Sequence, residues 1–196
     1  MLGGGRGPLG DIEGGVKEAV LRRALYKGHF LLSSGLHSEY YFEKFRILED
    51  PKLLRKFSEV LARNLKDFDV EWVVGPFTGG AILAYDLALV MGVFSAYAEK
   101  EGERRVLKRG YNIENRRVAI VDDVLTTGKS LRETYNAVLD AGGIPVVCGV
   151  MIKRGEISLE LPLFFILELN LPVFKPEDCP LCKAGIPLEI RGKGGL

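Results

Sequence analysis

The chain has few cysteines and almost no excess of basic residues over acidic ones. Its 196 residues include 3 cysteines, and 27 Lys and Arg against 26 Asp and Glu leave a formal net charge of +1. Three cysteines do not make a disulfide framework, which favours a reducing, cytoplasmic environment. The missing basic excess argues against a nucleic-acid partner, because non-specific binding needs positive charge to neutralise phosphates.

Long hydrophobic runs are missing as well. The longest apolar stretch, residues 81–98, contains Asp86 and breaks at Gly92, so it is too short and too interrupted to span a bilayer. The first ten residues are rich in glycine and lack the apolar segment of a signal peptide. We expect residues 1–10 to be a disordered arm and expect no membrane partner.

The spacing of the hydrophobic residues predicts an α/β fold. Helices are expected at 12–26, 51–65, 80–90 and 129–141, and strands at 29–32, 39–42, 72–74, 93–98, 117–121, 144–151 and 163–167. The alternation of apolar strands and helices indicates a central parallel sheet flanked by helices. We expect a single domain over residues 11–196, with a core of about 51–155 and a small cap from about 11–50 and 156–196.

The strongest chemical signal is the segment Val118-Ala-Ile-Val-Asp122-Asp123-Val-Leu-Thr126-Thr127-Gly128-Lys129-Ser130. Two carboxylates end an apolar strand, and a Thr-Thr-Gly turn then opens a helix. The free N–H groups of such a turn bind an anion, usually phosphate, and the carboxylates can accept hydrogen bonds from sugar hydroxyls. The segment therefore fits a phosphorylated ribose. An ATP-binding P-loop is excluded because it needs glycine at position 123.

An ordinary strand end followed by a helix cap is the simpler alternative for this segment, since Asp and Thr are common there. Two adjacent buried carboxylates are costly without a task, which favours the binding site.

The segment resembles the fingerprint of the type I phosphoribosyltransferases, which bind 5-phosphoribosyl 1-diphosphate. The resemblance implies that Asp122 and Asp123 hold the ribose hydroxyls and that residues 126–130 cradle the 5′-phosphate. The residues implied to bind this donor are Asp122, Asp123, Val124, Leu125, Thr126, Thr127, Gly128, Lys129, Ser130, Lys100, Thr78 and Gly79.

Three further stretches resemble the orotate phosphoribosyltransferases. Residues 30–44 resemble the N-terminal motif that covers the pyrimidine, residues 98–111 the mobile catalytic loop, and residues 179–187 a C-terminal signature of one branch. The residues implied to bind orotate are Thr126, Arg154, Ser34 and Gly35. The planar guanidinium of Arg154 suits the carboxylate of orotate.

This resemblance implies a phosphoribosyl transfer from 5-phosphoribosyl 1-diphosphate to orotate, giving orotidine 5′-monophosphate and diphosphate in de novo pyrimidine (UMP) biosynthesis. The residues implied to be catalytic are Lys100, Asp122, Asp123, Lys108 and Arg109. The implied cofactor is Mg²⁺, bound mainly through the substrate, and the implied assembly is a homodimer with shared active sites. Two alternatives are a phosphoribosyltransferase for a purine or uracil and a non-catalytic regulator that senses the donor.

The chain departs from the family's pattern at Thr78, Glu99 and Lys153, where better-studied members have Lys, Arg and often Asp. Neutralisation of the diphosphate therefore falls to Lys100, Lys108 or Arg109, and the sequence does not choose among them. Each feature also has a plainer interpretation: a solvated charged loop for residues 100–109, and an exposed loop arginine at 154. The Ser-Gly pair at 34–35 also fits a simple hairpin turn.

A protein-held metal ion is not expected. Cys179 and Cys182 have the spacing of zinc ligands, but a tetrahedral site needs four. Cys148 lies in an expected buried strand, and His29 and His37 are far away in the sequence.

Overall fold

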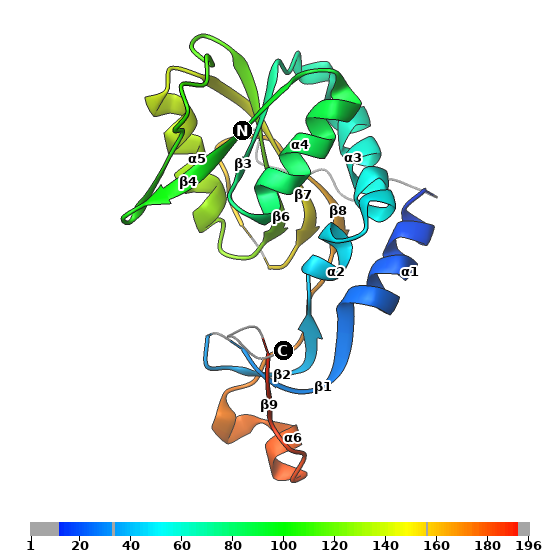
Figure 1. Ribbon diagram of the computed structural model, residues 1–196. Helices are drawn as coiled ribbons and strands as arrows, with labels where there is room; N and C mark the ends of the chain where they lie inside the picture. Colours follow the sequence, from blue (N-terminus) through cyan, green and yellow to red (C-terminus); the bar gives the residue numbers. More distant parts are fainter. Residues whose placement is uncertain (1–11, 33, 156, 192–196) are drawn as a thin grey trace.

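Two sheets of unequal size organise the chain (Figure 1). The computed structural model describes residues 12–32, 34–155 and 157–191, so the arm expected at residues 1–10 lies outside the described residues. The helices are α1 (Ile12–Ala24), α2 (Phe45–Leu48), α3 (Pro51–Leu65), α4 (Gly79–Met91), α5 (Lys129–Asp140) and α6 (Pro180–Lys183). The 3₁₀ turns are η1 (Lys66–Phe68) and η2 (Pro176–Asp178).

The large sheet has six strands in the order β5-β4-β3-β6-β7-β8. They are β5 (Arg104–Val106), β4 (Phe94–Glu101), β3 (Trp72–Pro76), β6 (Arg117–Leu125), β7 (Ile144–Lys153) and β8 (Leu163–Glu168). All neighbours are parallel except β5, which runs antiparallel to β4. The loops after β6, β7 and β8 therefore share one edge of the sheet, which is where such sheets bind ligands.

Helices cover both faces of this sheet, with α3 and α4 on one side and α5 on the other (Figure 1). Successive strand residues face opposite layers: Val73 and Val121 belong to the core beneath α3 and α4, while Val74 and Ile120 belong to the core beneath α5. This double burial explains why the strands are continuously apolar.

Helix α3 shows how local sequence sets the boundaries. The carboxylate of Asp50 accepts hydrogen bonds from the N–H groups of Lys52 and Leu53, and Pro51 occupies the first turn. The helix then buries an apolar stripe that includes Phe57 and Leu61. Full burial of one such side chain contributes about 1.5–3 kcal/mol.

The second sheet belongs to a small lobe that projects below the large sheet in Figure 1. We use "small lobe" for β1 (Leu25–Leu31), β2 (His37–Phe42), β9 (Glu189–Ile190), η2 and α6. Its strand order is β2-β1-β9, with β1 antiparallel to β2 and parallel to β9. The N-terminal and C-terminal segments of the chain therefore meet in this lobe.

The structure confirms the expected α/β class and differs in several details. The expected helix at 12–26 ends at Ala24, and β6 continues through both aspartates to Leu125 instead of ending before them. Residues 100–109, expected as a loop, include the end of β4 and all of β5, which pairs with β4 in antiparallel orientation. The division into core and cap stays a prediction, although β8, within the expected cap, lies in the large sheet.

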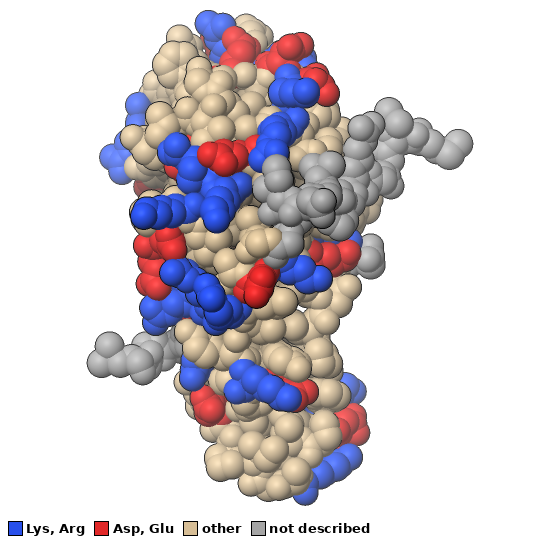
Figure 2. All heavy atoms as spheres, turned by 90° about the vertical axis from the view of Figure 1, so that its right-hand side faces the viewer, with Lys and Arg blue, Asp and Glu red and all other residues tan. Residues whose placement is uncertain are grey.

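Charged side chains of both signs are interspersed on the face shown in Figure 2, where α1 and α3 lie toward the viewer. None of the helices in the described part of the chain is long and apolar enough to cross a lipid bilayer.

Candidate functional site

A cavity of about 860 Å³ lies between the small lobe and the carboxyl edge of the large sheet. The small lobe and the chain next to it contribute Leu31, Leu32, Ser34, Gly35, Tyr41, Phe42, Ile190 and Arg191. The segments after β6, β7 and β8 contribute Thr126, Thr127, Arg154, Gly155, Leu169, Asn170 and Leu171. All four residues expected to bind orotate therefore line this cavity, while Ser33 lies outside the described residues.

Asp122 and Asp123 lie side by side on β6, and both are buried. One oxygen of Asp122 accepts a hydrogen bond from the Ser130 hydroxyl at 2.6 Å, and the other accepts one from the Asp123 N–H at 2.8 Å. Ser130 belongs to the first turn of α5, so this contact ties the expected ribose site to the expected phosphate loop.

Lys44 is a site residue that the sequence analysis did not identify. Its ammonium lies 2.7 Å from Oδ2 of Asp123, and it follows β2 in the chain. The only sequence signal was its position at the end of the 30–44 motif. This ion pair fixes the Asp123 carboxylate and connects the small lobe's strands to the large sheet.

The electrostatics of the two carboxylates are unequal. Burial, followed by repulsion from Asp123, raises the pKa of Asp122 from 3.8 to about 7, although the Ser130 hydroxyl opposes the shift. The pKa of Asp122 therefore lies close to neutral pH. Such perturbed carboxyl groups are concentrated in functional sites.

We expect Asp122→Asn to stabilise the protein at high pH. A carboxyl group whose pKa is raised on folding binds more protons in the native state than in the unfolded state, so it destabilises the fold increasingly as pH rises from about 4 to 7. A shift of about three units corresponds to at most about 4 kcal/mol. Urea unfolding at pH 4 and pH 8 measures the difference: the gain should be large at pH 8 and nearly absent at pH 4.

The exposed Asp140→Asn provides the control, since it makes the same chemical change on the surface. A gain for Asp122→Asn that is the same at both pH values would show that the native carboxyl does not hold a proton at neutral pH.

The expected phosphate loop connects β6 to α5. Gly128 has a φ of +73°, which L-amino acids with side chains rarely adopt, and it lets the chain turn into the helix. Thr126 and Thr127 are exposed to the cavity. The guanidinium of Arg132 donates to the Thr127 carbonyl and holds the loop's far side. The Ser130 hydroxyl in the first turn of α5 donates to Asp122, so the beginning of this helix lies next to that carboxylate.

The Gly75–Gly80 segment packs directly against the aspartates. A Cβ at Gly79 would collide with the Asp123 carboxylate, and a Cβ at Gly80 would lie 3.0 Å from Oδ1 of Asp122. The Phe77–Thr78 peptide bond in this segment is cis. Thr78 caps α4 and Gly79 begins it, and Gly79 packs against the Asp123 carboxylate.

Two arginines line the cavity, Arg154 and Arg191, and Arg191 is paired with Glu189. Burial lowers the pKa of the Arg154 guanidinium, which nevertheless stays charged at physiological pH. Among the described residues, no carboxylate lies within 4 Å of this guanidinium, whereas the adjacent Lys153 pairs with Glu168 at 2.9 Å. A partly buried cation without a protein partner favours an anionic ligand.

The three candidate cations for diphosphate lie on or near the β4–β5 hairpin. Lys108 pairs with Glu101 at 3.3 Å and Arg109 with Glu99 at 3.1 Å. Lys100 is exposed and has no carboxylate within 4 Å among the described residues. None of the three lines the cavity.

Comparisons with known proteins identify the family of the chain. No family model matches the chain. The orotate phosphoribosyltransferase of Thermotoga maritima is 44% identical over 176 residues, which cover 88% of this chain and 94% of that protein. The same enzyme from Caldanaerobacter subterraneus subsp. tengcongensis is 40% identical over 188 residues, which cover 92% and 99%.

A solved structure of orotate phosphoribosyltransferase from Aeropyrum pernix matches with a TM-score of 0.68 and 27% identity, and the match covers 81% of this chain and 94% of that one. The expected type I phosphoribosyltransferase fold is thereby confirmed. Since the identity to curated relatives extends over nearly the whole chain, this chain belongs to the orotate phosphoribosyltransferase family.

Proposed function

We propose that this chain transfers the 5-phosphoribosyl group from 5-phosphoribosyl 1-diphosphate to orotate, with the cavity at the carboxyl edge of the large sheet as the active site. The bond between the anomeric carbon and the diphosphate breaks, and a bond to the ring nitrogen of orotate forms as that nitrogen loses its proton. The product is orotidine 5′-monophosphate, an intermediate of pyrimidine biosynthesis. The observation that carries the proposal is the guanidinium of Arg154, which has no carboxylate partner among the described residues and lines a cavity together with Thr126.

The donor is held by groups at the junction of β6 and α5. Asp122 and Asp123 accept hydrogen bonds from the ribose hydroxyls, and the N–H groups of residues 126–130 bind the 5′-phosphate. Ser130 and Lys44 keep the two carboxylates in place through the contacts described above. Because the breaking bond leaves a cation-like ribose, the main contributions are positioning and stabilisation of charge.

The base is selected by its carboxylate. Arg154 lies at the end of β7, and its fork can pair with two carboxylate oxygens at once. Ser34 and Gly35 cover the opposite wall of the cavity. A purine or uracil offers no carboxylate and would leave the guanidinium unpaired, which argues against the alternative bases.

Mg²⁺ is proposed as the cofactor, held mainly through the substrate. The oxygens of Asp122 already accept hydrogen bonds, and Asp123 is paired with Lys44, so the protein does not present a free carboxylate cage. This donor set fits an ion that keeps several waters and binds phosphate oxygens. When bound, the ion neutralises charge on the diphosphate.

A homodimer with shared active sites accounts for the position of Lys100. The side chain is exposed and away from the cavity of its own chain, so a neighbouring copy is the natural place for it to act. Exposed apolar residues on α4 and β4, including Tyr85, Leu89 and Phe94, support such an association. We also propose a cytoplasmic location, because a chain with three cysteines suits a reducing compartment.

The experiment that tests the proposed function is an assay of orotate consumption with the donor and Mg²⁺, in parallel with uracil, hypoxanthine and adenine. Consumption of orotate in preference to the other bases is the expected result, and consumption of a purine or uracil in its place would contradict the proposal.

A further inference from the structure

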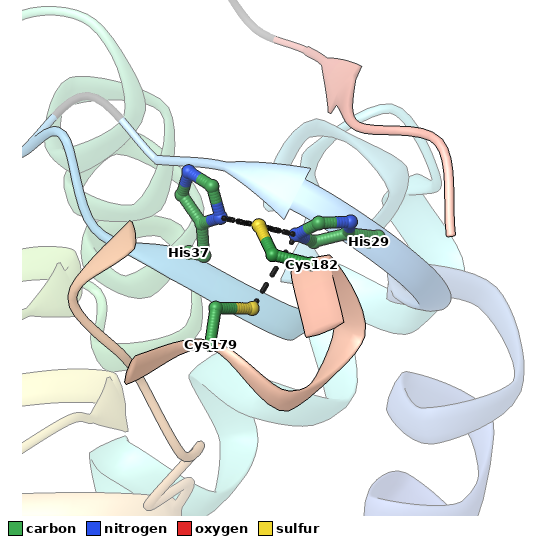
Figure 3. Close-up of side chains that lie close together, drawn as sticks. All are labelled: His29, His37, Cys179 and Cys182. Atoms are coloured by element: carbon green, nitrogen blue, oxygen red, sulfur yellow. Dashed lines mark hydrogen bonds between the residues drawn. The ribbon is translucent and has the colours of Figure 1, made fainter. Parts of the chain in front are cut away.

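Four metal-ligating side chains meet in the small lobe, on the side of β1 and β2 that α6 covers (Figure 3). They are His29, His37, Cys179 and Cys182, and their ligand atoms all lie within 4.8 Å of one another. The histidines precede the cysteines by 142–153 residues. The expectation that the protein holds no metal ion rested on this separation in the sequence. Folding brings the four residues together in space.

The distances between the ligand atoms approach those of a tetrahedral zinc site. Nε2 of His29 lies 3.0 Å from Nδ1 of His37, 3.4 Å from Sγ of Cys179 and 3.6 Å from Sγ of Cys182. The Cys182 sulfur lies 3.3 Å from Nδ1 of His37. Zinc bonds of about 2.0–2.1 Å to nitrogen and about 2.3 Å to sulfur separate neighbouring ligand atoms by about 3.3–3.8 Å.

The orientation of His29 is fixed in the way that metal-ligating histidines are. Its other ring nitrogen, Nδ1, lies 2.7 Å from the carbonyl oxygen of Ile186. With Nδ1 as the donor, Nε2 carries the lone pair and points at His37 and both sulfurs. A second hydrogen bond of this kind orients the imidazole and raises its basicity toward a metal.

The backbone places the other ligands on the same side. His37 is paired with Leu31 in the β1–β2 register, and His29 lies in β1 where this register shifts, between Lys27 and Phe30. The two imidazoles meet there, with Nε2 of His29 3.0 Å from Nδ1 of His37. Cys179 and Cys182 flank the first turn of α6, and the Lys183 N–H donates to the Cys179 carbonyl at 3.2 Å. Both cysteines are free thiols.

We propose that His29, His37, Cys179 and Cys182 bind one Zn²⁺ ion in a closed, structural site. Binding converts the two thiols to thiolates and releases their protons, so the charge of the ion is balanced by its sulfur ligands. Two nitrogens and two sulfurs in tetrahedral arrangement favour zinc over the hard cations that phosphate chemistry uses. Four protein ligands leave no open position, so the ion has no part in the transfer reaction.

The small lobe needs such a crosslink because its own core is minimal. Phe30 is the one large apolar side chain of the lobe that is fully buried in the described structure, and the other buried residues of the lobe are His29, His37, Ser38, Phe42 and Cys179. Structures below about 40 residues usually depend on metals, disulfides or oligomerisation. The ion would join the β1–β2 hairpin to the C-terminal segment, and both carry walls of the active-site cavity.

The test measures metal content and needs no activity assay, so its failure is separate from a failure of the proposed function. The full chain is purified under reducing conditions without chelator, and zinc is measured by elemental mass spectrometry. The zinc is then removed with a chelator and replaced by Co²⁺, whose absorption bands report tetrahedral geometry and thiolate ligands. Cys182→Ser changes the exposed ligand, and Cys148→Ala is the matched control, because Cys148 is a free thiol on β7 outside the cluster.

We expect about one zinc ion per chain in the wild type and in Cys148→Ala, and a loss of most of it in Cys182→Ser. Wild-type Co²⁺ protein should show both the tetrahedral bands and thiolate charge-transfer absorption, and Cys182→Ser should lose part of the latter. The proposal is overturned if the wild type neither contains zinc nor takes up Co²⁺ into thiolate ligation. A Cys179–Cys182 disulfide in protein isolated under reducing conditions would overturn it as well.

Discussion

Lys100→Ala is expected to lower kcat by about 10²–10³-fold while leaving the KM for the donor nearly unchanged. The reason is that charge on the departing diphosphate develops as its bond to ribose breaks, so a cation that meets it then stabilises the transition state more than the bound substrate. Of the three candidate cations, Lys100 alone has no carboxylate partner among the described residues, which leaves its charge available. Steady-state kinetics with both substrates varied give the two parameters.

Lys108→Ala and Arg109→Ala are the matched controls on the same hairpin. Their cations already pair with Glu101 and Glu99, and we expect effects of about tenfold or less. If the donor's KM rises in Lys100→Ala while kcat is unchanged, Lys100 contributes uniform binding and the assigned role is wrong.

The same variant tests the shared active site. Lys100→Ala and Asp122→Asn carry defects that would lie in different chains of one site. Mixed after dissociation and reassociation, they should recover about a quarter of wild-type activity, because half of the dimers would be mixed and each would hold one intact site of two. Activity no higher than that of the separate variants would contradict a site built from two chains.

Arg154→Ala is expected to lower kcat/KM for orotate by about 10²-fold or more, because the substrate carboxylate would enter a partly buried pocket without its cation. The KM for 5-phosphoribosyl 1-diphosphate should change little, since the donor is held by the β6–α5 segment. Arg154→Lys keeps the charge and loses the planar fork, so its loss should be intermediate. Both values come from initial rates at saturating concentrations of the other substrate.

Uracil provides the internal control for this prediction, because it resembles orotate but has no carboxylate. The preference for orotate over uracil should fall in Arg154→Ala. An unchanged preference would mean that another group recognises the carboxylate and that Arg154 supports the loop structurally.

The sequence predicted those features that depend on local pattern. The strands and helices from residue 51 onward follow hydrophobic periodicity, and the adjacency of Asp122 and Asp123 brings two carboxylates together wherever the strand lies. The hydrophobic pattern predicted that β6 ends before the aspartates, because these residues are polar. In the structure both aspartates are buried beside Gly79 and Gly80, and the strand continues to Leu125.

The features that escaped prediction depend on contacts between distant segments. The ion pair of Lys44 with Asp123 requires the turn after β2 to return to the large sheet. The histidine–cysteine cluster requires the C-terminal segment to fold back on β1 and β2, and neither pairing leaves a periodic signal. The β4–β5 hairpin was not predicted, because its charged residues also suit a solvated loop.

The most direct test of the central claim is the loss of orotate ultraviolet absorbance when the purified chain meets orotate, 5-phosphoribosyl 1-diphosphate and Mg²⁺. Uracil, hypoxanthine and adenine are run in parallel, and released diphosphate is measured in each. The proposed function predicts that orotate is consumed with one diphosphate released per orotate, and that the other bases react far more slowly. Untouched orotate, or faster consumption of a purine or uracil, would contradict it.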